Sequence, residues 1–96
     1  MTYYIVKVIS KATKDNPNFA GMASIAYYGK DQKLLGMEGI AHDYLNDTNK
    51  ITPYMVKTYA YKRKCDAARS YVYNNCCSTQ YWTKQVEIIE VEAETA

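Results

Sequence analysis

The sequence predicts a single α+β domain over residues 1–96, with an antiparallel sheet of about four strands in the order β-β-β-α-β and one long helix packed on one face. Two observations predict this class. Four segments concentrate β-branched and aromatic residues, and one long segment before the last of them repeats its apolar residues with a helical period. Since hydrophobic residues make up 48% of the 96-residue chain, a single packed core is expected rather than disorder.

The first two strands are predicted over Thr2–Lys11 and Phe19–Tyr28. In the first strand both alternating sets of side chains are apolar, which is typical of a central strand whose two faces are covered. Residues 14–18 are rich in Asn, Asp and Pro and have the composition of a loop. A hairpin turn is expected at Gly29–Gln32, where Gly29 would supply a positive φ.

The third strand is predicted over Lys33–Ala41 and the last over Tyr81–Val91. Gly36 and Gly39 weaken the third strand and indicate a bulge or an edge position. In the last strand we expect one face to carry Trp82, Val86 and Ile88, and the other to carry Ile89 and Val91. Residues 92–96 are expected to fray. The place at which the last strand joins the sheet does not follow from the sequence.

After a polar, turn-rich stretch at residues 42–50, one long helix is predicted over Thr52–Asn75. Thr52 is a good N-cap, Pro53 suits the first helical position, and asparagine tolerates the left-handed conformation that ends helices. Six residues recur at alternating steps of four and three and so share one face: Tyr54, Thr58, Tyr61, Cys65, Ala68 and Val72. Four more widen that face on one side: Val56, Ala60, Ala67 and Tyr71. We expect this face to lie on the sheet.

The opposite face of the predicted helix is polar and aromatic: it carries Tyr59, Lys62, Arg63, Asp66, Arg69 and Tyr73. Flat rings among long cations can bind phosphates and bases, or can form the tyrosine- and arginine-centred hot spot of a protein interface. The alternative is an ordinary solvated face, on which Asp66 pairs with neighbouring cations. The candidate binding residues are therefore Tyr59, Lys62, Arg63, Arg69 and Tyr73.

The charge of the chain is small overall, +2, but unevenly distributed. Residues 53–75 contain five basic residues and one acidic residue, a local charge of +4, whereas residues 86–96 contain four glutamates and no basic residue, a local charge of −4. We expect these two charges to compensate each other within the fold, with the helix lying near the acidic end. The net charge by itself does not indicate a nucleic-acid partner.

Candidate catalytic and metal-binding groups are few. His42, with Asp43 beside it, could join a cysteine in a Cys-His-Asp constellation, but nothing in the sequence sets that geometry. Cys65, Cys76 and Cys77 lack the spacing of zinc ligands. We therefore expect no enzyme, no metal and no cofactor. An odd number of cysteines without signs of secretion predicts reduced thiols in a cytoplasm, and neither a signal peptide nor a membrane span is expected.

The composition favours a small protein that binds another protein. Eleven tyrosines offer rigid contact area with a polar tip, as binding surfaces do. The excess of Lys, Asn and Tyr in one short domain resembles the small accessory proteins of phages and mobile elements in low-GC bacteria. That resemblance implies a regulator or inhibitor that binds a host or defence complex.

A second function, nucleic-acid binding, follows from another resemblance. The stretch Ala23–Tyr28, then Gly29-Lys30, then Leu35-Gly36 resembles the second hairpin of AP2-type and integrase arm-binding domains, in which a three-stranded meander precedes a helix. The resemblance implies a sheet that reads DNA; the basic helix face is the other candidate surface. The sequence departs from this pattern where those domains carry Arg and Trp, because its first three strands and their turn offer Lys7, Lys11, Lys30 and Lys33. The fourth strand also falls outside the pattern.

Overall fold

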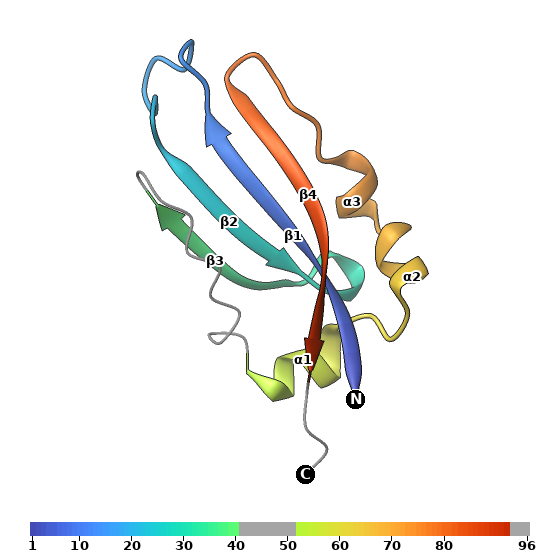
Figure 1. Cartoon of the computed structure of the whole chain (residues 1–96). Helices are drawn as coiled ribbons and strands as arrows, with labels where there is room; N and C mark the ends of the chain where they lie inside the picture. Colours follow the sequence, from blue (N-terminus) through green and yellow to red (C-terminus); the bar gives the residue numbers. More distant parts are fainter. Residues whose placement is uncertain (41–51, 93–96) are drawn as a thin grey trace.

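The computed structural model describes residues 1–40 and 52–92. Its centre is a four-stranded antiparallel sheet in the spatial order β3-β2-β1-β4 (Figure 1). The strands are β1 (Thr2–Ala12), β2 (Ala23–Tyr28), β3 (Leu34–Ile40) and β4 (Trp82–Glu92). The other elements are the short turn η1 (Lys30–Gln32) and the helices α1 (Pro53–Tyr59), α2 (Lys64–Ala68) and α3 (Tyr71–Asn75). The predicted α+β class and the order β-β-β-α-β are confirmed.

β1 is a central strand, as its two apolar faces predict, and β4 joins the sheet beside it. The pairing of β1 with β4 is continuous from Thr2 opposite Glu92 to Ala12 opposite Trp82. β3 lies at the other edge, and its pairing with β2 shifts register at Tyr27/Tyr28, so the predicted edge position and irregularity are confirmed. Glu92, predicted to fray, is the last residue of β4, whereas the predicted fraying of 93–96 and the predicted loop at 42–50 lie outside the described residues.

The prediction of one continuous helix over Thr52–Asn75 is wrong, because the segment folds as three short helices. Thr52 caps α1 as predicted, accepting a hydrogen bond from the amide of Met55, but the backbone becomes extended at Ala60 (φ −71°, ψ 156°). Ser70 is extended too, and its hydroxyl accepts from the amide of Tyr73 to start α3. A serine in an extended conformation is a favourable N-cap, so Ser70 starts a new helix rather than continuing the previous one.

The first break coincides with a backbone contact to the sheet. The amide of Tyr4 donates to the carbonyl of Tyr61, and the amide of Tyr61 donates back to the carbonyl of Tyr4, both at 2.8 Å. These bonds replace the helical ones that Tyr61 would otherwise make. Since β2 pairs with β1 only as far as Val6 opposite Tyr28, Tyr61 occupies the place beside β1 that β2 has left.

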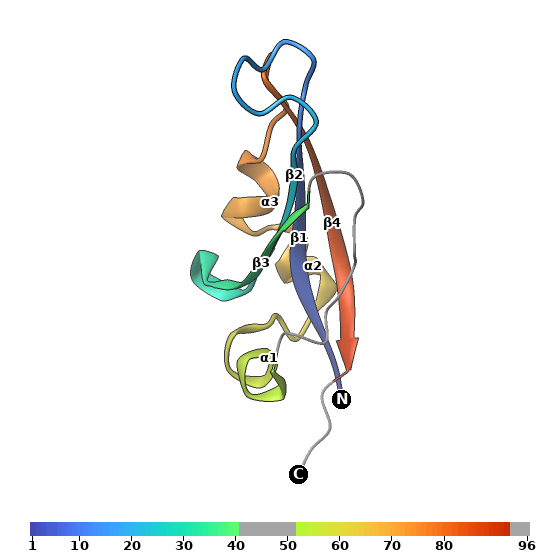
Figure 2. The ribbon, with the colours of Figure 1, turned by 90° about the vertical axis from the view of Figure 1, so that its left-hand side faces the viewer.

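At Tyr61 the chain passes from one face of the sheet to the other, a passage that we call the crossing, and the helices before and after it lie on opposite faces. Val56 of α1 packs in a cluster with Ile5, whereas Ala67 and Val72 of α2 and α3 pack in a second cluster with Val6. Successive side chains of a strand point to opposite faces, so α1 covers one face and α2 and α3 cover the other. In Figure 2, α1 lies at the end where β1 begins and β4 ends, and α3 lies farther along the sheet.

The crossing also changes which residues of the helical segment are buried. Val56, Ala60, Ala67 and Val72 are buried, as predicted. Four residues assigned to the same buried face are instead exposed: Tyr54, Thr58, Cys65 and Tyr71. The steps of four and three describe one face only while the helix is continuous, and each break resets the register.

Gly29 is needed for a different reason from the predicted one. Its φ is −109°, and the left-handed conformations of the turn belong to Asp31 (φ 56°) and Gln32 (φ 58°). A Cβ at Gly29, however, would lie 2.5 Å from the carbonyl oxygen of Tyr59. The glycine therefore allows the end of β2 to approach the end of α1.

Candidate functional site

The structure distributes the five predicted binding residues over the whole helical segment. Lys62 and Arg63 precede α2, Arg69 follows it, Tyr73 belongs to α3, and all four are exposed. Tyr59 ends α1, is half-buried, and lies under the Lys33 ammonium, which is 5.1 Å from its ring centroid. Because α1 covers the other face of the sheet, Tyr59 is separated from the remaining residues of the set.

Arg63 is held by Asp66. Its Nε and Nη2 donate to the two carboxylate oxygens of Asp66 at 3.0 and 3.1 Å, and these hydrogen bonds raise the pKa of Arg63 above its ordinary value. The pairing is the one expected for a solvated helix face. Within residues 1–40 and 52–92, no acidic group forms an ion pair with Lys62 or Arg69. The predicted compensation between the helical segment and the acidic end therefore involves no ion pair among these residues.

Two other titratable groups have shifted pKa values. Burial raises the pKa of the Tyr61 phenol, and a hydrogen bond with Ser70 opposes part of that shift. The Glu92 carboxylate accepts a hydrogen bond from the Thr2 hydroxyl and lies 3.5 Å from the N-terminal ammonium. The hydrogen bond, more than the ammonium, lowers the pKa of Glu92. The Tyr61–Ser70 hydrogen bond joins the segment before α2 to the start of α3, and the contacts of Glu92 join the end of β4 to the start of the chain.

The three thiols are free, with Cys65 and Cys77 exposed and Cys76 half-buried. In the part of the chain that the structure describes, no three Cys, His, Asp or Glu residues gather as potential metal ligands. His42 and Asp43, the other members of the candidate Cys-His-Asp constellation, lie outside the described residues. Likewise, no helix of the described segments is long and apolar enough to cross a membrane.

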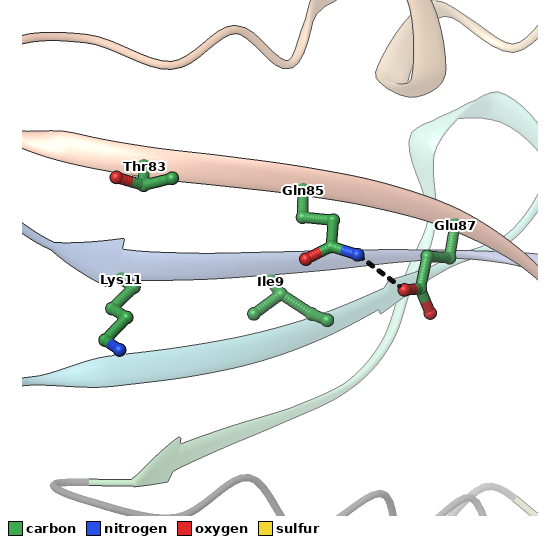
Figure 3. A pocket seen from close by; sticks show the side chains of 5 residues that line it. All are labelled: Ile9, Lys11, Thr83, Gln85 and Glu87. Atoms are coloured by element: carbon green, nitrogen blue, oxygen red, sulfur yellow. Dashed lines mark hydrogen bonds between the residues drawn. The ribbon is translucent and has the colours of Figure 1, made fainter.

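A shallow open groove of about 320 Å³ lies across β1 and β4, on the face that α1 partly covers (Figure 3). Ile9, Lys11, Thr83, Gln85 and Glu87 line it. The Gln85 amide donates to the Glu87 carboxylate at 2.8 Å, at the opposite end of the groove from Lys11 and Thr83. A groove with an apolar floor and polar walls can hold an extended side chain of a partner.

A second surface lies at the end of the sheet where β1 ends and β4 begins, which is the upper end in Figure 1. There the 13–22 loop carries Phe19 and Met22, Tyr81 immediately precedes β4, and Trp82 begins it. We call these four residues the apolar tip. Phe19, Met22 and Tyr81 are 49%, 45% and 46% exposed. The rings of Phe19 and Trp82 contact each other, with centroids 6.1 Å apart.

Hydrogen bonds join the two loops of the apolar tip, which are the 13–22 loop and the residues that immediately precede β4. The amide of Thr13 donates to the carbonyl of Tyr81 at 3.0 Å, and the Thr13 hydroxyl donates to the carbonyl of Gln80 at 2.7 Å. Asn16 is buried; its side-chain amide donates to the same Tyr81 carbonyl, and its side-chain oxygen accepts from the amide of Phe19. The exposed rings are therefore presented on a braced support, which lowers the entropy lost on binding.

Sequence reasoning placed Phe19 and Tyr81 inside strands and so missed the apolar tip. Ala23–Tyr28 is the observed second strand, six residues long, and it begins after both Phe19 and Met22. The signal present in the sequence was Asn16, because an asparagine in a turn can bond to the backbone two or three residues further on. Its contact with Tyr81, 65 positions away, has no local signal.

No protein-family model, curated protein or solved structure matches this chain.

Proposed function

We propose that this chain is a small non-enzymatic binding protein that engages another protein through the apolar tip. The observation that carries the proposal is the exposure of Phe19, Met22 and Tyr81 on two loops braced by Thr13 and Asn16. Large apolar side chains gathered at one exposed place are typical of contact surfaces. Aromatic residues and methionine are also enriched at the cores of protein interfaces.

The residues expected to contribute most to the binding energy are inferred from side-chain type. Tyrosine and tryptophan dominate hot spots because they bury a large area and keep a polar group for a hydrogen bond. Trp82 is half-buried with its ring against Phe19, and Tyr81, the residue before it, is exposed. A complementary apolar pocket on the partner would cover them.

The class of partner follows from composition. The resemblance to small accessory proteins of phages and mobile elements supports a cytoplasmic host or defence complex as the partner, and regulation or inhibition as the consequence of binding. An inhibitor of this kind needs a rigid contact surface and no reacting groups, and the braced tip fits that requirement.

Nucleic-acid binding is the second candidate, and one observation favours it. Lys62 and Arg69 are exposed, are not ion-paired with any described acid, and belong to the same helical segment as the exposed tyrosines Tyr71 and Tyr73. Cations interleaved with aromatic rings suit a single-stranded backbone and its bases. The sheet itself is less suited, because helices cover part of both faces and Lys7 is buried.

The experiment is a comparative capture from a lysate of the native host, with bound species identified by mass spectrometry and nucleic-acid sequencing. The immobilised baits are the wild-type chain, a Phe19→Ser/Tyr81→Ser variant, and a Lys62→Ala/Arg69→Ala variant as the matched control. The proposal expects one protein to be captured by the wild type and the control and to be lost from the tip variant. A protein retained by the tip variant would contradict the tip as contact surface, and a captured nucleic acid lost from the control would establish the second candidate.

A further inference from the structure

The groove across β1 and β4 is the part of its sheet face that α1 leaves uncovered. Val56 of α1 packs in the core cluster on this face, whereas Ile9 packs against the margin of that cluster and is only half-buried. The β4 side chains that line the groove are exposed: Thr83, Gln85 and Glu87. An apolar side chain laid over Ile9 would therefore extend the core that α1 begins.

The two ends of the groove carry opposite charges. Lys11 lies at one end beside Thr83, and Glu87 lies at the other end beyond Gln85 (Figure 3). Within residues 1–40 and 52–92, the Lys11 ammonium forms no ion pair. Glu87 accepts a hydrogen bond from the Gln85 amide, and Lys7, which is buried opposite Glu87, forms no ion pair with it. Both exposed charges are accessible to charged groups of a partner.

The spacing of the two charges matches that of an extended chain. Lys11 lies opposite Thr83, and Glu87 is four residues farther along β4, a span of about 13 Å in an extended strand. In an extended segment lying along these strands, residues i, i+2 and i+4 point to the same side and cover the same span. Ile9 lies opposite Gln85, midway between the charges, and so faces position i+2.

The Lys11 end of the groove adjoins the apolar tip. Thr83 directly follows Trp82, and Ala12, which directly follows Lys11, pairs with Trp82. The groove therefore begins one residue pair from the tip and runs away from it along β1 and β4 (Figure 3). A partner that covers the tip can continue into the groove with a neighbouring segment of its chain.

We propose that the groove binds an extended segment of the partner protein that carries an acidic, an apolar and a basic side chain at positions i, i+2 and i+4. The acidic side chain lies against Lys11, the apolar one covers Ile9, and the basic one lies against Glu87. The inference rests on the proposed function, because it assigns a second part of the surface that binds the partner. The charges also set the direction of the segment, since its acidic end must lie toward the apolar tip.

Two peptides of identical composition test the groove by NMR titration of the full chain at low salt, up to about 10 mM peptide. The probe is acetyl-Asp-Ser-Val-Ser-Lys-amide, and the control is its isomer acetyl-Asp-Lys-Val-Ser-Ser-amide, in which the charges are adjacent. The probe should shift the amide resonances of residues 9–11 and 83–87 and bind about threefold or more tightly than the isomer, the discrimination that exposed ion pairs provide. Equal affinities, no binding of the probe, or shifts confined to other elements would overturn the proposal.

Reversing one charge of the groove should exchange the peptide preference. Lys11→Glu should weaken binding of the probe by about threefold to tenfold and should favour acetyl-Lys-Ser-Val-Ser-Lys-amide instead, because that peptide carries a basic side chain at both ends. Lys64→Glu is the matched control: it makes the same change in net charge at an exposed residue of α2, on the other face of the sheet, and should leave the preference unchanged. A preference that does not follow the charge at Lys11 would overturn the proposal.

The affinity of each variant for the protein captured from the host separates this inference from the proposed function. If Phe19→Ser/Tyr81→Ser loses the captured protein while Lys11→Glu and Glu87→Lys bind it as tightly as wild type, the tip is the contact surface and the groove proposal is overturned. If the two groove variants bind it about threefold or more weakly and the tip variant binds it normally, the tip is contradicted and the groove proposal holds. Weaker binding by all three variants supports both.

Discussion

Replacing Gly29 by alanine tests the crossing of the helical segment through the sheet. The added Cβ would lie 2.5 Å from the carbonyl oxygen and 2.9 Å from the carbonyl carbon of Tyr59. Ordinary contact requires about 3.5 Å, so one backbone segment must move by roughly 1 Å. That movement is resisted, because the neighbouring Ala60 and the preceding Val56 are each 1% exposed and packed against the sheet.

The expected cost can be worked from these contacts. Overpacking of a core costs about 1–3 kcal/mol, and a clash between two backbone segments belongs at the upper end of that range. The lower chain entropy of alanine in the unfolded state offsets about 0.4–1 kcal/mol. The net loss for Gly29→Ala is therefore about 2 kcal/mol, which lowers the melting temperature of a domain of this size by about 8–16 °C.

The assay is thermal and urea unfolding followed by circular dichroism, with Gly21→Ala as the control. Gly21 has a positive φ of 86° but open space around its Cβ position, so its replacement costs only backbone strain, about 1 kcal/mol. Gly29→Ala should be the more destabilising of the two. A Gly29→Ala variant as stable as wild type would mean that α1 does not end against β2, and the crossing at Tyr61 would be wrong.

Three further outcomes are expected. Val72→Asp should lose about 3 kcal/mol or more and fail to melt cooperatively, because it places an unpaired carboxylate in the second core cluster; near-wild-type melting would place Val72 at the surface. Arg63→Ala with Arg69→Ala should change the unfolding free energy by less than about 0.5 kcal/mol, since the one ion pair removed is exposed, and in a nucleic-acid complex it should flatten the slope of log affinity against log salt by about two. Glu92→Gln should lower the melting temperature at about pH 7, and the effect should shrink as the pH falls below 4.5: the folded pKa is below the ordinary 4.5, so the stabilisation exists above 4.5 and is lost as the pH falls through the folded pKa. An effect that does not depend on pH would exclude an ionic origin.

The strands could be predicted because their signals are local. β1 is predicted to within one residue, and the two faces of β4 are confirmed by Val86 opposite Val8 and Ile89 opposite Ile5. Glycines correctly marked β3 as an edge. These features depend on side-chain alternation and on turn residues, both of which are written in short stretches of sequence.

The path of the helical segment could not be predicted in the same way. Its composition favours a helix throughout, and the break at Ala60 arises because Tyr61 bonds to Tyr4, far away in the chain. Ser70 did carry a local signal, since serine favours the N-cap. The predicted binding residues are divided between two faces for the same reason: Tyr59 shares a face with Arg63 only in an unbroken helix. The apolar tip could not be predicted locally either, because Asn16 and Tyr81 meet across two distant parts of the chain.

The central claim, that the chain binds a protein through the apolar tip, is tested most directly by hydrogen exchange of the chain alone and in complex with the captured protein. The account predicts slowed exchange at residues 13–22 and 79–82, with the amides of α2 and α3 unchanged. Protection confined to α2 and α3, with unchanged exchange at Phe19 and Tyr81, would contradict it.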